Sequence, residues 1–182
     1  DPDAFDALAF LIEAGGKRVF WSGDFRGHGK KRALFKKISA TPLTGVDGLV
    51  MDVRIPGPGS PQYQDERAVA ARITQVLQEH KNITLLAASS QNIARVVGAY
   101  NACLKTNSIL VIDIYTAFIL DRLKKAAPMI PPLNWKNIRI RFLSEQAERL
   151  SAVGYRDLLY VYGRRKIDLF EITRHKNRIL LM

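Results

Sequence analysis

The sequence predicts an α/β protein whose second part is built around a parallel sheet. Continuous apolar runs fill residues 83–88, 108–113 and 158–162. Segments with apolar residues at helical spacing occupy 65–79, 91–105 and 117–126. Apolar strands that alternate with amphipathic helices are typical of a parallel sheet covered on both faces. The alternation of apolar and basic residues over 137–142 adds a half-exposed strand.

The first part of the chain has the pattern of a small antiparallel unit. Two strand-like runs, residues 8–13 and 17–22, flank a Gly-Gly pair, which predicts a β-hairpin. After a glycine-rich loop, the basic segment 30–38 has the spacing of a short amphipathic helix. A buried strand over 48–53 follows.

A domain boundary is expected between these two parts. Residues 55–61 contain three prolines and two glycines, the composition of a linker. We therefore expect one domain over 1–55 and another over 62–182. The second domain should also contain a helix that begins with Ser144 as its N-cap, a helix over 166–174 and a final strand.

Composition excludes several classes of protein. The 182 residues include one cysteine, so an internal disulfide is excluded and we expect a reducing, cytoplasmic environment. With 47% apolar and 25% charged residues the chain should fold, and its apolar runs are too short to predict a membrane partner. The apolar run at the C-terminal end leads us to expect a piece of a longer protein, the alternative being a complete small domain whose last strand docks in a sheet. Oligomeric state stays open.

Four small polar residues stand where a predicted strand turns into a helix. They are Ser89, Ser90, Gln91 and Asn92. Backbone N–H groups at such a helix start bind anions, phosphate above all, and ligands gather at the carboxyl ends of parallel strands. Thr116 follows the next strand in the equivalent place, so both strand ends are candidate substrate-binding positions. The alternative is plain N-capping by Ser90.

Positive charge predicts a polyanionic partner. The chain carries 28 Lys and Arg against 17 Asp and Glu, a formal net charge of +11. Arg139 and Arg141 are two apart on a predicted strand and so share one face. Nucleic acid, RNA in preference to DNA, or a phosphorylated substrate fits this charge, and the alternative is a solvated basic surface.

The residues that bear metal and nucleophile chemistry are sparse. The three histidines, His28, His80 and His175, have no metal-ligand spacing. His28 lies in the glycine-rich loop, where it is either a catalytic candidate or simply solvated. Asp24 follows the predicted hairpin and can hold a metal or cap a turn. Cys103 lies on an amphipathic helix and should be a packing residue.

Several of these segments resemble a known family. Residues 9–29, with the string Ser-Gly-Asp-Phe-Arg over 22–26, resemble the distal half of a metallo-β-lactamase-fold metallohydrolase. The likeness is greatest to the branch with an inserted β-CASP domain, the ribonuclease J and cleavage-factor-like nucleases. Residues 86–92, 111–117 and 134–139 are similar to segments of that inserted domain. The resemblance implies part of a metallo-β-lactamase lobe followed by a β-CASP-like α/β domain.

The resemblance also implies a chemistry. In such a hydrolase Asp24 would bridge two zinc ions that activate water against an RNA phosphodiester, and Asp52 would mark the entry to the inserted domain. Val53 departs from the hydroxyl residue that the family places after this acid. The His-x-His-x-Asp-His motif is absent, as are the family's C-terminal histidines. We therefore expect zinc in the parent protein, none retained by this chain, and no hydrolysis by the chain alone.

Three functions remain open on this evidence. The chain is part of a metal-dependent nuclease, or a non-catalytic nucleic-acid-binding module, or an α/β domain that binds a small phosphorylated ligand. Whether the chain is itself an enzyme is not decided by its sequence.

Overall fold

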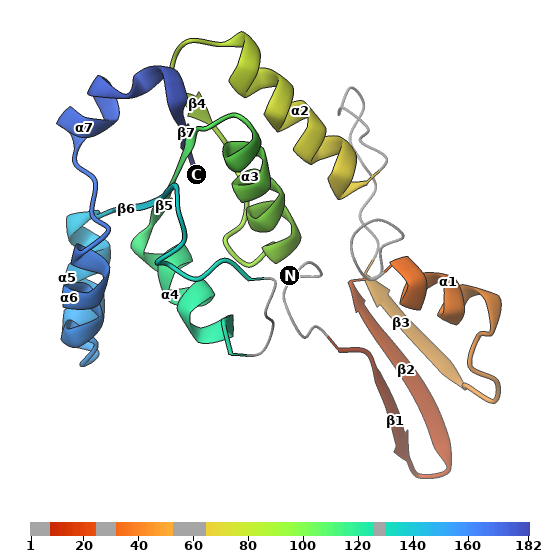
Figure 1. The fold of residues 1–182 in the computed structure, drawn as a ribbon. Coiled ribbons are helices and arrows are strands. Elements are labelled where there is room, and N and C mark those ends of the chain that lie inside the picture. Colours follow the sequence, from red (N-terminus) through yellow and green to blue (C-terminus); the bar gives the residue numbers. More distant parts are fainter. Residues whose placement is uncertain (1–7, 25–31, 53–64, 126–129) are drawn as a thin grey trace. The chain divides into compact units, whose positions relative to one another are not determined.

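The α/β class is confirmed by the computed structural model, which describes residues 8–24, 32–52, 65–125 and 130–182 (Figure 1). The chain forms two compact units, unit 1 over Asp1–Ala68 and unit 2 over Val69–Met182. The expected linker over 55–61 lies outside the described residues. Each unit is presented by itself.

Unit 1 contains a three-stranded sheet in the order β1-β2-β3. The predicted hairpin is confirmed, since β1 (Phe10–Ala14) pairs antiparallel with β2 (Lys17–Asp24). Gly15 and Gly16 make its turn with φ of 56° and 73°, the positive values that a two-residue turn of this kind requires. Strand β3 (Gly48–Asp52) pairs parallel with β2, and α1 (Arg32–Ala40) lies between them in sequence.

The sheet of unit 1 leaves much apolar surface open. Phe10 and Trp21 face each other across the hairpin with ring centroids 5.5 Å apart. Large apolar side chains exposed on the three strands are Phe10, Leu11, Ile12, Trp21, Leu49, Val50 and Met51. Apolar area of this extent usually marks an interaction surface.

Unit 2 contains the predicted parallel sheet. Its strands are β4 (Thr84–Leu85), β5 (Ile109–Asp113), β6 (Ile138–Arg141) and β7 (Ile179–Leu181). All pairings are parallel and the order is β4-β7-β5-β6, so the last strand of the sequence lies inside the sheet. Strand β4 is much shorter than the predicted 83–88. Beyond its two residues, the Leu86 N–H makes one further hydrogen bond to the Leu181 carbonyl.

Helices cover both faces of this sheet. The helices are α2 (Glu66–Glu79), α3 (Ile93–Lys105), α4 (Ile114–Leu123), α5 (Ser144–Ala152), α6 (Arg156–Gly163) and α7 (Leu169–Arg174), followed by a short 3₁₀ turn, η1 (Lys176–Arg178). The larger core joins α2, α3 and α4 to the strand side chains Leu110, Ile112 and Leu180. On the opposite face Val111 and its neighbours pack against Ile172 of α7, forming a second, smaller cluster.

Two sequence predictions within unit 2 are wrong. Residues 158–162, predicted as a strand, belong to helix α6. Leu158, Leu159 and Tyr162 pack on the core while Tyr160 and Val161 are exposed, so this short apolar run follows the helical period. Ser144 is the first residue of α5 and Leu143 holds the N-cap position, without a side-chain cap bond.

The position of β7 predicts that alanine substitutions at two leucines of this sheet will change the free energy of unfolding by different amounts. Leu180 is 0% exposed in β7, whereas Leu85 of β4 is 73% exposed. Leu180→Ala should lower the free energy of unfolding by about 2–5 kcal/mol, because it leaves a cavity in the core. Leu85→Ala, the matched control, should change it by less than about 1 kcal/mol. Urea denaturation followed by circular dichroism measures both, and equal losses would contradict this register.

Candidate functional site

The two predicted strand ends meet in the structure. Ser90 lies in the turn after β4, and Thr116 lies in the first turn of α4 after β5. Their hydroxyl oxygens are 2.6 Å apart, a hydrogen bond in which either group can donate. The sequence therefore located a real polar junction between strand ends that are 26 residues apart in the chain.

Asp113 holds this junction in place through hydrogen bonds to both of its carboxylate oxygens. Its Oδ1 accepts a hydrogen bond from the Thr116 backbone N–H at 2.7 Å and so caps α4. Its Oδ2 accepts from Nε2 of Gln146 at 2.6 Å, which ties α5 to the same point. Gln146 was not predicted, since its role depends on how α5 packs. Its Oε1 is buried without a hydrogen-bond partner.

The start of α3 is capped differently from the prediction. Asn92 is the N-cap and its Oδ1 accepts from the Arg95 backbone N–H at 2.9 Å, so capping by Ser90 is wrong. The Ser90 hydroxyl is instead hydrogen-bonded to the Thr116 hydroxyl. Ser89 Oγ accepts from the Gln91 backbone N–H at 3.2 Å, and Gln91 Nε2 donates to the Tyr115 hydroxyl at 3.2 Å.

These bonds limit what the junction can bind. Thr116 is 1% exposed, and both its hydroxyl and its backbone N–H are bonded within the protein. Asn92 is buried in its cap. The Asp113 carboxylate already stands at the N-terminus of α4, where an anion would otherwise be favoured. The exposed groups are Ser89, Gln91 and Tyr115, a neutral rim that suits hydrogen bonding better than phosphate capture.

Arg139 and Arg141 lie where the sequence placed them, on one face of β6. The strand alternates, with Ile138 and Ile140 buried and both arginines partly exposed. Arg139 is in register with Val111 and Arg141 with Asp113. Neither arginine forms an ion pair with a carboxylate of the described chain. Among the predicted site residues, these two therefore carry positive charge that no described carboxylate pairs with.

Asp24, the predicted metal-bridging residue, and Asp52, the residue expected to mark the entry to the inserted domain, are neighbours in the backbone of unit 1. Asp24 ends β2, Asp52 ends β3, and the two are in register across the parallel pair. His28 lies outside the described residues. Within the described ranges no three His, Cys, Asp or Glu side chains come together as metal ligands. Two acids alone are fewer than the three or four protein ligands that hold a catalytic zinc ion.

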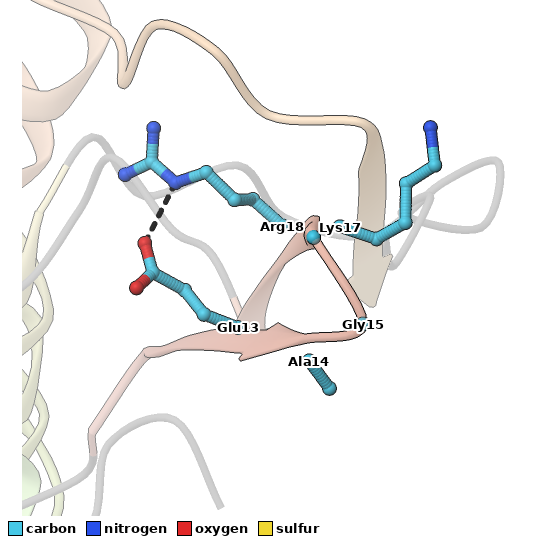
Figure 2. Close-up of a pocket in the computed structure, with 6 residues that line it drawn as sticks. Glu13, Ala14, Gly15, Lys17 and Arg18 are labelled. Atoms are coloured by element: carbon cyan, nitrogen blue, oxygen red, sulfur yellow. Dashed lines mark hydrogen bonds and ion pairs between the residues drawn. The ribbon is translucent and has the colours of Figure 1, made fainter.

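A hollow of about 390 Å³ lies at the hairpin turn of unit 1 (Figure 2). It is lined by Glu13, Ala14, Gly15, Gly16, Lys17 and Arg18. Arg18 Nε donates to Glu13 at 2.8 Å, and Lys17 Nζ donates to Asp47 at 2.9 Å. The bond from Lys17 lowers the pKa of Asp47. The charged side chains that line the hollow are thus held in ion pairs, one between themselves and one with Asp47.

Cys103 is excluded as a nucleophile. The side chain is 0% exposed within the core, as the sequence predicted for a packing residue. Burial raises the pKa of its thiol to about 12, so the thiol stays protonated at neutral pH.

Comparisons with known proteins add a fold and no function. No family model and no curated protein matches this chain. Among solved structures, it is similar to a protein of unknown function from Enterococcus faecalis V583, with a TM-score of 0.62 and 18% identity. The match covers 98% of this chain and 38% of that protein, so the chain spans well under half of its structural neighbour. The resemblance to β-CASP hydrolases stays a prediction.

No helix in the ranges that the structure describes is both long enough and apolar enough to cross a membrane.

The Asp113 junction predicts a graded effect of two substitutions. Asp113→Ala removes the α4 cap and leaves Gln146 Nε2 unpaired, which should cost about 1–3 kcal/mol of unfolding free energy. Asp113→Asn keeps the cap, and its amide can donate to the unpartnered Gln146 Oε1 once that side chain rotates. It should therefore cost less than half as much. Chemical denaturation tests this order, and equal losses would show that the junction is not a hydrogen-bonded one.

The raised pKa of Cys103 predicts its reactivity. Alkylation of the folded chain by iodoacetamide should stay far slower than that of the unfolded chain from about pH 7 to pH 10, because the side chain is buried and a thiol that ionises near 12 is almost wholly protonated there. In denaturant the rate should climb with pH through the ordinary thiol range near 9. Folding favours the protonated thiol, so the free energy of unfolding should fall as pH rises from about 9 toward 12. Mass spectrometry of timed samples measures the rates, and rapid native labelling at neutral pH would contradict the burial.

Proposed function

We propose that this chain is the nucleic-acid-binding part of a metal-dependent hydrolase, a nuclease acting on RNA phosphodiesters, and that it is inactive by itself. Unit 1 would be the distal part of a metallo-β-lactamase lobe, and unit 2 the β-CASP-like domain that holds the substrate. The zinc centre would need ligands from other parts of the longer protein.

One observation carries the binding half of this proposal. From residue 136 to the end the chain has eleven basic and five acidic residues. Of the eleven, Arg149 alone pairs with a carboxylate in the described structure, through Glu145 on the same helix. Uncompensated cations on one region of a domain are the electrostatic signature of a polyanion partner.

The hydrolase half has weaker support from unit 1. Asp24 and Asp52 end adjacent strands, which is an arrangement that can supply carboxylates to a metal centre completed by other residues. The open apolar faces of the β1-β2-β3 sheet fit a lobe that packs against further polypeptide. Both features fit a chain that works within a larger hydrolase.

A non-catalytic nucleic-acid-binding module is favoured by the same unpaired cations. It differs from the first proposal in needing neither Asp24 nor a metal. The small-phosphate alternative loses support, because the Ser90–Thr116 junction is closed by its own hydrogen bonds.

The purified 182-residue chain should bind single-stranded RNA and should not cut it. Binding of a fluorescent polyuridine oligonucleotide should weaken steeply between about 50 and 200 mM salt, because each phosphate contact releases a counterion. Added zinc or manganese should give no cleavage products on a denaturing gel. Affinity that is flat with salt contradicts polyanion binding. Cleavage, or stoichiometric zinc by elemental analysis, contradicts the inactivity of this chain.

A further inference from the structure

We propose that Arg139, Arg141 and Arg165 form one phosphate-binding surface, here called the arginine face, that holds the backbone of single-stranded RNA. This inference rests on the proposed nucleic-acid binding and assigns it to a place. The sequence paired Arg139 with Arg141, and the structure adds Arg165 from a segment 24 residues further along.

The backbone brings Arg165 beside β6. The Ile140 N–H donates to the Arg165 carbonyl at 2.8 Å, and the Ile167 N–H donates to the Ile140 carbonyl at 3.0 Å. Residues 165–167 therefore run parallel to the outer edge of β6, with Lys166 opposite Ile140.

This register sets the direction of the side chains. Because side chains alternate along extended backbone, the residues on either side of Ile140 point away from the larger core. Ile167 packs in the second cluster with Val111, on the opposite face of the sheet. Arg165 precedes the bridge residue Lys166, so the backbones of Arg139 and Arg165 occupy adjacent positions on neighbouring segments.

Among the described residues no carboxylate forms an ion pair with these arginines. Like charges on directly opposed strand positions repel each other. Asp113, in register with Arg141, has both oxygens bonded to Thr116 and Gln146. Asp168, the next acid after Arg165, caps α7 through the Glu171 N–H. None of the three arginines makes an ion pair with any described residue.

The guanidinium groups are partly tethered and keep free donors. Arg139 Nη1 donates to the Ile138 carbonyl at 2.8 Å, and Arg165 Nη2 donates to the Asn134 carbonyl at 3.0 Å. A guanidinium has five N–H donors, and its fork matches phosphate oxygens. Three half-buried arginines with no ion pair to a described carboxylate fit phosphate groups spaced along a chain.

An exposed aromatic side chain on helix α7 favours a single strand over other polyanions. Helix α7 packs through Ile172 into the same cluster as Ile167, and its first turn exposes Phe170 by 74%. Exposed aromatic rings beside basic residues stack unpaired bases. Phe170 is therefore the candidate stacking residue of the arginine face.

The test compares charge-matched variants of the full chain. Arg139→Gln, Arg141→Gln and Arg165→Gln combined should weaken binding of a polyuridine oligonucleotide of about 12 nucleotides by roughly tenfold or more, and should reduce the salt slope by about 2. The control combines Lys81→Gln, Lys105→Gln and Lys125→Gln, three exposed lysines of unit 2 with the same loss of charge. It should weaken binding by less than about threefold.

The outcomes separate the surface from the function. If the wild type does not bind the oligonucleotide, the proposed function and the arginine face both fail. If it binds and the arginine variant binds equally well, or the lysine control loses as much, the arginine face is wrong while the function stands. Arg141→Gln alone tests the face if the triple variant does not fold, because its side chain makes no described hydrogen bond; an unchanged salt slope would then overturn it.

Phe170→Ala supplies a second readout on the same surface. It should weaken binding by about fivefold or more without changing the salt slope, because it removes stacking and no charge. Tyr160 is also 74% exposed, on helix α6, whose Tyr162 lies in the larger core, so Tyr160→Ala is its matched control. A loss at Tyr160 equal to that at Phe170 would overturn the stacking assignment.

Discussion

The backbone hydrogen bonds that hold β7 between β4 and β5 organise unit 2. Its three residues, Ile179 to Leu181, pair with β5 on one side, and Leu180 and Leu181 pair with β4 on the other. Leu180 lies in the larger core and Ile179 in the second cluster, so this short strand contributes a buried side chain to each face of the sheet. Without it β4 would have no described neighbour in the sheet, and the core shared with α3 would lose Leu180.

The position of β7 also decides which strand becomes an edge. With β7 inside, β6 lies at the end of the sheet, and its outer side is covered by the backbone of residues 165–167. Hydrogen bonds to residues 165–167 occupy backbone groups of Ile140 at the β6 edge, and they bring Arg165 beside Arg139. The accumulation of positive charge thus follows from topology: helices α5 and α6 intervene between β6 and residue 165, and the chain returns to the strand it left.

Much of this could be read from the sequence, and the failures have physical causes. The hairpin, the parallel sheet, the meeting of Ser90 with Thr116 and the shared face of Arg139 and Arg141 follow from local periodicity and from strand ends sharing an edge. Helix α6 was mistaken for a strand because an apolar run of five residues fits either period. Gln146 and Arg165 were missed because their roles arise from tertiary contacts with residues more than 20 positions away.

The central claim is that a polyanion meets the arginine face, and that the closed junction of Ser90 and Thr116 takes no part. Nuclear magnetic resonance of the labelled chain, titrated with a polyuridine oligonucleotide, tests it most directly. The account predicts that the largest shifts fall on the amides of 139–141 and 165–167 and on the arginine Nε–H signals. Shifts concentrated instead at residues 89–92 and 115–116 would contradict it.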